Sequence, residues 1–307
     1  GLREYILGLT HSAISPDLHC GGAFAKGLEV SRHALWVRGD SLSDATLRGA
    51  WAISDYWGDV DPEPEKHGKP HIKSLVNTVA ALYSYFEEYD PNTDGIEPYY
   101  YGDGKPAIEF TFAIPMEVNH PVSGEPIIFC GRCDLLGHFN DFFCVVDEKT
   151  TTSLGTQWVY KWAMRGQFIG YCYAAQHYGL PISSALIRGI AFQVKEFKHM
   201  QVIEQYPQWQ IDRWWQEANA KVQHLVDIWN FNCEVYGDTI DSPTFTQFCN
   251  SWQHSYGDAC DSYGGCPYRK DICTCENPED WLSEFDIRRW DPLKKNPAVP
   301  ILVGGNN

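Results

Sequence analysis

The sequence predicts a mixed α/β protein in which a helical first third precedes a β-rich middle, followed by helix, strand and helix. Two observations support this prediction. Apolar residues recur at the three- and four-residue spacing of helices before residue 90, and β-branched and aromatic residues concentrate between residues 107 and 150. With 307 residues, 44% of them hydrophobic, the chain can bury a substantial core.

Three helices are predicted in the first third, at residues 22–38, 43–57 and 71–89. The third shows the pattern most fully, because its apolar residues return at helical spacing: Ile72, Leu75, Val76, Val79, Leu82 and Phe86. Residues 90–105 are rich in Asp, Asn, Gly, Pro and Tyr, which is typical of a loop.

That loop contains a partial calcium-binding pattern. Its opening matches an EF-hand loop in four residues: Asp90, Asn92, Asp94 and Gly95. The twelfth position is Tyr101 where the motif needs a bidentate Glu, and Pro98 disfavours a following helix. We therefore expect no calcium site there.

Three antiparallel strands are predicted next, at residues 107–116, 126–138 and 142–150, with Asn140 and Asp141 as the turn between the last two. Further elements follow in order: a helix at 158–178, one or two strands within 184–205, and a long helix at 208–229. From Gly237 onward the chain is loop-rich.

The strand around residue 147 carries the residues of greatest chemical interest. Side chains alternate along a strand, so Asp147 and Lys149 share one face while Glu148 points to the other. A hairpin about Asn140 would bring Asp134 to the same place. Two carboxylates beside an ammonium can hold Mg²⁺ or Mn²⁺, polarise a phosphodiester and stabilise the charge that develops on it. The alternative is a turn aspartate and a surface ion pair, since an isolated Asp-x-Lys is a weak signal.

The context of this tripeptide resembles a known family. Gly131-Arg132-Cys133-Asp134, a hairpin, and then Val145-Val146-Asp147-Glu148-Lys149-Thr150-Thr151 resemble the Gly-x-x-Asp and Asp-x-Lys-Thr motifs of RecB-like PD-(D/E)XK nucleases. The resemblance implies a restriction-endonuclease-like core, with a mixed central sheet flanked by helices. It implies one nuclease domain over 1–307, with a helical region at 1–105, a catalytic core at 106–236 and a Cys-rich segment at 237–307.

Further motifs extend the resemblance. Gln167 and Tyr171 lie four residues apart on the following helix and are similar to the family's Gln-x-x-x-Tyr motif, which implies contact with substrate DNA or support of Lys149. Glu109 stands where related nucleases often carry a strand glutamate near the metal. On the other interpretation, the helix pair is simply amphipathic and Glu109 faces solvent.

The first motif of the family is only partly present. Gly22-Ala23-Phe24-Ala25-Lys26-Gly27-Leu28-Glu29 resembles a helix that begins Gly-x-x-x-His and ends near Leu-Glu, but Lys26 takes the place of the histidine. A protonated lysine cannot ligate a metal, so this departure puts a histidine ligand in doubt and leaves Glu29 as the candidate on this helix for a place at or next to the metal.

Eleven cysteines fall into two groups. Seven are scattered and are predicted to be buried thiols in a reducing compartment: Cys20, Cys130, Cys133, Cys144, Cys172, Cys233 and Cys249. Four lie close together near the C-terminus: Cys260, Cys266, Cys273 and Cys275. Thiolates so close in sequence suit a soft metal or an iron-sulfur cluster, and the compartment disfavours a disulfide.

The spacing of Cys260, Cys266 and Cys273 resembles the C-terminal triplet of iron-sulfur nucleases such as AddB and the CRISPR-adaptation exonucleases. The resemblance implies a structural [4Fe-4S] cluster whose fourth ligand comes from near the N-terminus. That ligand would precede Gly1, or be replaced by Cys20, Cys249 or Cys275. Structural zinc and unliganded thiols are the alternatives.

The net charge of −16 argues against a surface that coats nucleic acid, although it leaves room for a local basic groove, to which Arg288, Arg289, Lys294 and Lys295 could contribute. No apolar run long enough for a membrane span and no signal peptide are visible, so we expect an intracellular, cytoplasmic protein without membrane partners.

Taken with the resemblance, these observations predict an Mg²⁺- or Mn²⁺-dependent DNA nuclease. The preferred assignment is an exonuclease of recombination or repair, with a phage-encoded origin left open. Three alternatives remain: a nuclease for RNA or branched DNA, a catalytically silent DNA-binding scaffold, and a metal or redox protein organised by the cysteines. Protein partners are not predicted.

Overall fold

The computed structural model describes residues 9–11, 15–66, 68–236, 268, 274–275, 280, 283 and 285–287. It confirms the predicted mixed α/β class, with a curled mixed sheet flanked by helices. The chain divides into two compact units. The larger comprises Ser15–Ile114, Phe129–Gln216 and Asn296–Asn307, and the smaller comprises Gly1–Ile14, Pro115–Ile128 and Glu217–Lys295. The larger unit contains every candidate residue of the nuclease site.

The N-terminal helices of the larger unit follow the prediction with shifted bounds. Helix α1 spans Pro16–His33 and runs into a π-helical turn, η2, at Ala34–Arg38. Helix α2 spans Leu42–Trp57 and helix α3 spans Leu75–Glu88. Both begin at a serine, Ser41 or Ser74, whose hydroxyl accepts a backbone N–H of the first turn, as N-cap residues do.

These helices pack closely because small residues meet at their crossing. A Cβ on Gly49 of α2 would lie 2.6 Å from the carbonyl oxygen of Gly27 on α1, so the two backbones touch at this point. Phe24, Ile53 and Leu82 are buried around it and join the three helices into one core cluster with the sheet residues Ile190 and Phe192. This burial supplies most of the driving force for the layer.

The six-stranded sheet has the order β4-β6-β7-β8-β9, with β5 paired to β6. Its strands are β4 Ile96–Pro98, β5 Ile108–Asn119, β6 Pro126–Phe139, β7 Phe142–Thr151, β8 Ser184–Phe192 and β9 Phe197–Gln205. Strands β6 and β7 form the predicted antiparallel hairpin, and Asn140 at its turn has φ +52°. Strand β8 runs parallel to β7 and is buried along its whole length, as an interior strand covered on both faces must be.

One predicted helix is wrong. Residues 158–178 form two helices, α4 at Thr156–Tyr160 and α5 at Gly166–His177, separated by a turn at residues 161–165. The turn persists because partners from elsewhere take its carbonyls: the Tyr206 hydroxyl donates to Trp162 O at 3.0 Å and Gln210 Nε2 donates to Ala163 O at 2.9 Å. Such tertiary hydrogen bonds compete with the helical ladder and are invisible to local sequence periodicity.

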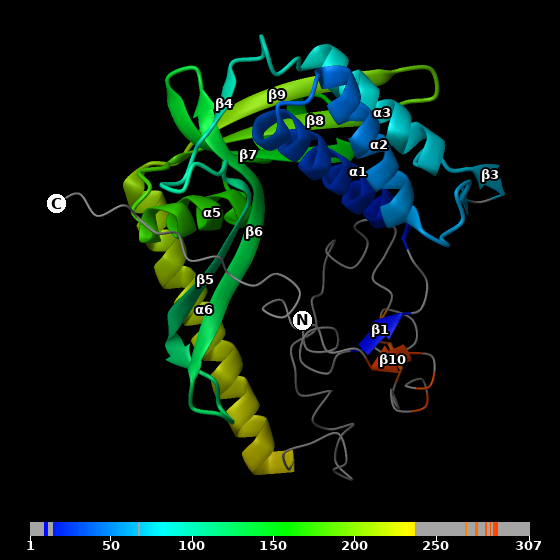
Figure 1. The fold of residues 1–307 in the computed structure, drawn as a ribbon. Coiled ribbons are helices and arrows are strands. Elements are labelled where there is room, and N and C mark those ends of the chain that lie inside the picture. The colour runs from blue at the N-terminus through cyan, green and yellow to red at the C-terminus, as the bar shows by residue number, and fades with distance from the viewer. Residues whose placement is uncertain are drawn as a thin grey trace. The chain divides into compact units, whose positions relative to one another are not determined.

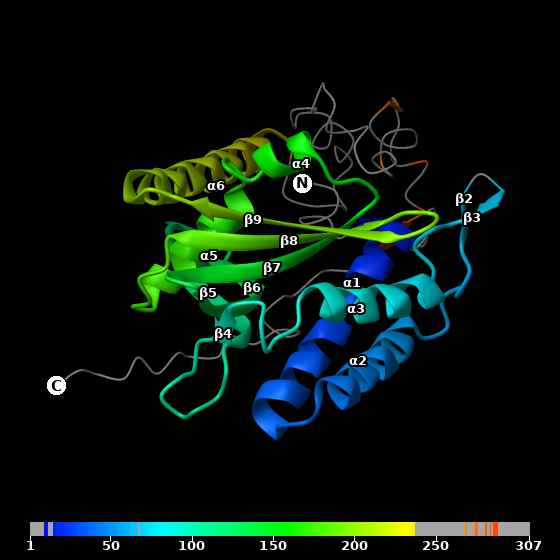
Figure 2. The same cartoon turned by 90° about the horizontal axis from the view of Figure 1, so that it is seen from above.

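Helices cover both faces of the sheet. Figure 1 and Figure 2 show α1, α2 and α3 on one side of β7 and β8, and α5 on the other. The last helix, α6, spans Gln208–Tyr236, longer than the predicted 208–229. Within the described residues, no helix combines the length and the apolar character needed to cross a membrane.

Two small antiparallel pairs complete the described elements. Strands β2, Glu65–Lys66, and β3, Lys69–Pro70, pair in the larger unit. In the smaller unit β1, Leu9–His11, pairs with β10, Phe285–Ile287, and the ring of Tyr268 stacks on Phe285 with centroids 5.4 Å apart. The predicted cluster cysteines Cys260, Cys266 and Cys273, together with Cys249, lie outside the described residues, as do Arg288, Arg289, Lys294 and Lys295.

Candidate active site

The hairpin register brings Asp134 and Asp147 together. Strand β6 pairs with β7 through Leu135 opposite Val146, so one further step of the same register sets Asp134 opposite Asp147. Directly opposed residues of an antiparallel pair project to the same face. The sequence-level prediction that these carboxylates share one face of the hairpin therefore agrees with the geometry.

Lys149 completes the group. Its Nζ lies 2.6 Å from Asp147 Oδ2 and 5.6 Å from the centroid of the Phe168 ring on α5. Burial lowers the pKa of Lys149, the neighbouring carboxylates of Asp147 and Asp134 raise it, and the net shift is upward. The side chain is therefore held as an ammonium ion, with its position set by a carboxylate on one side and an aromatic face on the other.

Asp147 is buried, and the neighbouring Asp134 is half-buried. Asp147 is 2% exposed, and Asp134 Oδ2 accepts a hydrogen bond from the backbone N–H of Glu148 at 3.2 Å. Burial, followed by the charge of Asp147, raises the pKa of Asp134 well above its ordinary value. Burial raises the pKa of Asp147 more than Lys149 lowers it. A buried carboxylate with a half-buried one beside it favours the binding of a cation or a proton.

Glu109 stands next to this pair on the strained start of β5. Its φ of +56° lies in the left-handed region, which residues other than glycine rarely adopt. Such backbone strain costs about 1–3 kcal/mol. Burial raises the pKa of Glu109 to about 7 even though Arg132, with Nε 2.5 Å from Glu109 Oε2, lowers it. The carboxyl of Glu109 also lies close enough to Asp134 to raise the pKa of that residue.

Glu29 is linked to the site through Glu109, whose pKa its charge raises. Both Glu29 oxygens accept hydrogen bonds from Lys26 Nζ at 2.8 Å, one helical turn earlier on α1. The lysine that departs from the family's first motif thus neutralises the glutamate of the same motif. Glu29 is a neighbour of the carboxylate group, and its oxygens are already occupied by an ammonium.

Gln167 and Tyr171 brace the strand that carries Asp134. Gln167 Nε2 donates to the Tyr171 hydroxyl at 3.0 Å, and that hydroxyl donates to the carbonyl oxygen of Arg132 at 2.8 Å. The expected support for Lys149 comes from another residue of α5, Phe168, whose ring lies below the ammonium. The described contacts of Gln167 and Tyr171 therefore fix β6, two residues before Asp134.

The sequence analysis missed a buried polar network on the opposite face of β7. Glu148 forms an ion pair with Arg32 of α1 and accepts a hydrogen bond from the Tyr85 hydroxyl of α3 at 2.9 Å. Arg188 of β8 donates to Tyr85 at 3.2 Å and to Asp94 at 2.8 Å. Asp94, one of the residues of the partial EF-hand pattern, is thus paired with an arginine. Only unusually apolar surroundings for two arginines could have signalled this network from the sequence.

The donor set fits a hard cation. Asp147 Oδ2 and Glu109 Oε2 are buried oxygens that lack a well-aligned hydrogen bond among the described residues, although each lies against a cationic nitrogen. Carboxylate oxygens of this kind are ligands that Mg²⁺ and Mn²⁺ prefer. Within the described part of the chain, no three His, Cys, Asp or Glu side chains already stand in metal-holding positions.

Four of the six scattered cysteines that the structure describes are buried as predicted, whereas Cys130 and Cys233 are half-buried. Cys20, Cys133, Cys144 and Cys172 are buried thiols. Burial raises the pKa of Cys20 to about 11, and the Thr78 hydroxyl donates to its sulfur at 3.2 Å. A buried, protonated thiol packed in the helical core is a poor stand-in for the missing cluster ligand. Cys275 is half-buried.

Comparison with known proteins adds little. No protein-family model matches the chain. No curated protein sequence matches it either. Among solved structures, one described as "Crystal structure of SSO0001" is 14% identical over 65% of this chain and 75% of that chain, with a TM-score of 0.27. A likeness at that TM-score carries no argument, so the functional case depends on the site itself.

Proposed function

We propose that this protein is a metal-dependent nuclease that hydrolyses phosphodiester bonds of DNA. The observation that carries the proposal is the meeting of Asp134, Asp147 and Lys149 on one face of the β6–β7 hairpin, with Asp147 buried, Asp134 half-buried and the ammonium paired to Asp147. Structural ion pairs are usually exposed or fully matched in charge. Here the buried carboxylate of Asp147 and the half-buried one of Asp134 face one ammonium, and Glu109 adds a third carboxyl nearby.

Asp134 and Asp147 would hold the cation, with Glu109 beside them. When bound, Mg²⁺ or Mn²⁺ would supply positive charge to the scissile phosphate and lower the pKa of the attacking water. The chain's own part is to hold these carboxylate oxygens in place. The Tyr171 hydroxyl anchors β6 to α5 through the backbone carbonyl of Arg132, and the backbone N–H of Glu148 orients the Asp134 carboxylate. A site fixed by packing and hydrogen bonds costs little reorganisation during the reaction.

Lys149 would act as an ammonium. Its upward pKa shift, the result of burial opposed by Asp147 and Asp134, keeps it protonated at neutral pH. It is thus suited to orienting water or stabilising the charge that grows on the phosphate, and unsuited to removing a proton. Phe168 prevents the side chain from swinging away.

Within this proposal the enzyme is a cytoplasmic exonuclease of DNA recombination or repair, and a phage-encoded origin stays open. Two alternatives are separated by the experiment below: a nuclease that acts on RNA or branched DNA, and a catalytically silent DNA-binding scaffold. We also propose a structural [4Fe-4S] cluster at Cys260, Cys266 and Cys273, with zinc as the alternative metal. That proposal rests on sequence spacing. A visible charge-transfer absorbance lost in Cys266→Ser would support the cluster, and nuclease activity that survives the loss would show its role to be structural.

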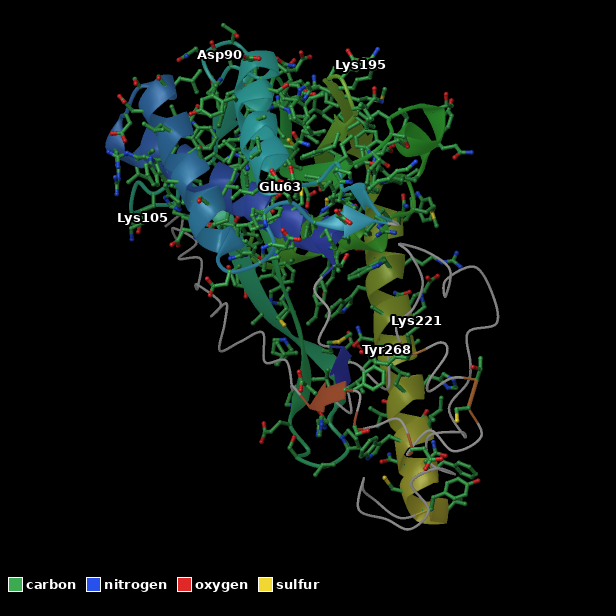
Figure 3. The ribbon with its side chains drawn as sticks, turned by 90° about the vertical axis from the view of Figure 1, so that its right-hand side faces the viewer. Glu63, Asp90, Lys105, Lys195, Lys221 and Tyr268 are labelled. Carbon is green, nitrogen blue, oxygen red and sulfur yellow. The ribbon has the colours of Figure 1, made fainter. Side chains whose placement is uncertain are left out.

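The decisive experiment is digestion of end-labelled linear DNA, closed circular DNA and RNA with Mg²⁺ or Mn²⁺. We expect the wild-type chain to degrade linear DNA and to leave closed circles intact, and Lys149→Ala to lower kcat at least about 100-fold, the usual cost of losing a charge-stabilising group. The matched control is Lys195→Ala, which removes an exposed lysine on the β8–β9 hairpin (Figure 3) and should keep full activity. No digestion by the wild type under either metal would sink the proposal and favour the scaffold.

A further inference from the structure

The segment that follows the candidate catalytic strand has an unusual charge distribution. Acidic residues make up 40 of 307 positions, yet none occurs between Glu148 and Glu196. The same stretch contains Lys149, Lys161 and Arg165, all before or at the start of α5. In a chain of net charge −16, this local absence of carboxylates leaves one cationic region next to the site.

A row of aromatic rings joins the two lysines. Trp158 and Trp162 meet with ring centroids 5.1 Å apart, and Trp162 and Phe168 meet at 5.5 Å. Lys161 Nζ lies 4.2 Å from the Trp162 centroid, and Lys149 Nζ lies 5.6 Å from that of Phe168. The two ammonium groups therefore stand over neighbouring rings of one aromatic row, from the candidate catalytic lysine to the turn between α4 and α5.

The rings can approach the sheet because Gly189 lies directly across from Lys149 in the parallel β7–β8 pair. A Cβ at Gly189 would lie 2.5 Å from the Trp158 ring. The indole fills the space that a side chain would need. Trp158 and Trp162 are 5% and 3% exposed, and their indole N–H groups have no acceptor among the described residues.

The turn that carries Lys161 and Arg165 is held rigidly. Its carbonyls at Trp162 and Ala163 accept the hydrogen bonds from Tyr206 and Gln210 described above. Arg165 N donates to Trp162 O at 2.9 Å and closes the turn. Preorganised cations bind an anion at a lower entropic cost than cations on a mobile loop.

Neither Lys161 nor Arg165 has an acidic partner among the described residues. Both are exposed, and Tyr160 beside them is 74% exposed. Burial, followed by the charges of Arg165 and Lys149, lowers the pKa of Lys161, so the three cations lie close enough to repel one another. An anion placed among them would relieve that repulsion.

We propose that Lys161 and Arg165 form a phosphate-binding subsite that holds the backbone of a nucleic-acid strand beside the scissile bond. The inference deepens the proposed nuclease function and rests on it for the identity of the anion. Lysine and arginine on a rigid platform contact successive backbone phosphates without reading sequence, and an exposed aromatic next to them offers a stacking surface for a base.

The test is direct binding of short fluorescent single-stranded and duplex oligonucleotides, measured by anisotropy with EDTA present so that nothing is cleaved. We expect Lys161→Ala/Arg165→Ala to weaken binding at least about 10-fold at low salt and to reduce the slope of log affinity against log salt by between about 1 and 2. With Mn²⁺ present the same variant should raise KM and leave kcat near the wild-type value, because neither residue is assigned to the reacting atoms.

Lys195→Ala/Lys198→Ala is the matched control, since it removes two exposed cations at the β8–β9 hairpin. The inference is overturned if Lys161→Ala/Arg165→Ala binds as the wild type does, if the control loses as much affinity, or if the wild type binds neither probe. Digestion by the wild type separates the two proposals. If binding depends on Lys161 and Arg165 but the wild type digests nothing, the subsite proposal stands and the nuclease proposal fails. If the wild type digests DNA and the variant digests it equally well, the nuclease proposal stands and the subsite proposal fails.

Discussion

At the scale of single residues, Asp147 illustrates how a carboxylate is kept where water cannot reach it. It is 2% exposed, and Lys149 compensates only part of the free-energy cost of its burial, which is why its pKa remains raised. A divalent cation would complete the compensation.

We therefore predict that Mn²⁺ stabilises the wild-type chain. Metal at about 100 times its Kd should add about 2.7 kcal/mol to the free energy of unfolding and raise Tm by several degrees. Asp147→Asn should lose this shift, because the amide offers the cation one neutral oxygen in place of a charged carboxylate. Asp103→Asn removes an exposed aspartate that pairs with Lys105 and should keep it. Differential scanning fluorimetry with Mn²⁺ or EDTA measures both, and an undiminished shift in Asp147→Asn would argue against this ligand.

His199 shows the opposite sign of titration. Burial lowers its pKa despite the charges of Glu88 and Glu87, and its Nε2 shares a hydrogen bond of 2.8 Å with the Ser84 hydroxyl. The folded state therefore binds this proton less readily than the unfolded state, whose histidine titrates near 6.5. The contribution to stability is complete above that pH and is lost as the pH falls through it.

From this sign we predict that His199→Gln flattens the decline of Tm between pH about 7.5 and 5.5, because glutamine can bond to Ser84 and cannot be protonated. Wild type and variant should converge in slope above pH about 7 and diverge below it. Parallel melting profiles over the whole range would show that His199 does not contribute to acid sensitivity.

At the scale of elements, the polar network around Glu148 ties two helices to two strands of the sheet. Arg32 belongs to α1, Tyr85 to α3, Glu148 to β7 and Arg188 to β8, and the two arginines are 4% and 1% exposed. Glu148 sits between Asp147 and Lys149 in the sequence, so the network also holds the backbone of the candidate site from behind.

Removing one charged residue of this network should therefore lower the free energy of unfolding substantially. We predict that Arg32→Met lowers the free energy of unfolding by about 3–5 kcal/mol, because it leaves the charge of Glu148 buried and unmatched. Arg48→Met breaks an exposed pair with Asp40 and should cost less than about 1 kcal/mol. Urea denaturation followed by circular dichroism compares the two, and equal effects would mean that burial of the Arg32 pair has no special weight.

At the scale of the whole molecule, a net charge of −16 must be reconciled with a polyanionic substrate. The carboxyl groups of Asp134, Asp147 and Glu109 add local repulsion at the point where a phosphate would approach. The acid-free stretch before and within α5 partly offsets this repulsion. A bound cation would reverse the sign of the field at the site itself.

The Lys149→Ala variant should bind DNA without cleaving it. It can therefore show whether a bound cation changes the electrostatic attraction between the site and DNA. We predict that this variant binds DNA at least about 10-fold more tightly with Mn²⁺ than with EDTA, equivalent to about 1.4 kcal/mol. Asp147→Asn combined with Lys149→Ala should show a smaller gain, because part of the cation site is gone. Equal affinity in Mn²⁺ and EDTA would contradict a metal site in the path of the substrate.

Much of the site was predictable because its determinants are local. The two-residue turn at Asn140 and the alternation of side chains along β7 are sufficient to set Asp134 opposite Asp147 and to place Lys149 on the same face. The alternation also sent Glu148 to the other face, as observed. Side chains alternate between the two faces along any strand, so these positions follow from the local sequence without contacts to distant segments.

Only the tertiary structure decided what meets these residues. Arg32 is 116 positions from Glu148, and the turn that breaks the predicted helix at 158–178 depends on hydrogen bonds from Tyr206 and Gln210. Neither contact leaves a periodic trace in the sequence. From the sequence alone came the class of fold and the grouping of Asp134, Asp147 and Lys149, since these follow from spacing along the chain. The burial of Asp147, the pKa shifts of these three residues and the placing of Lys161 near Lys149 arise from packing between segments far apart in sequence, which no local pattern encodes.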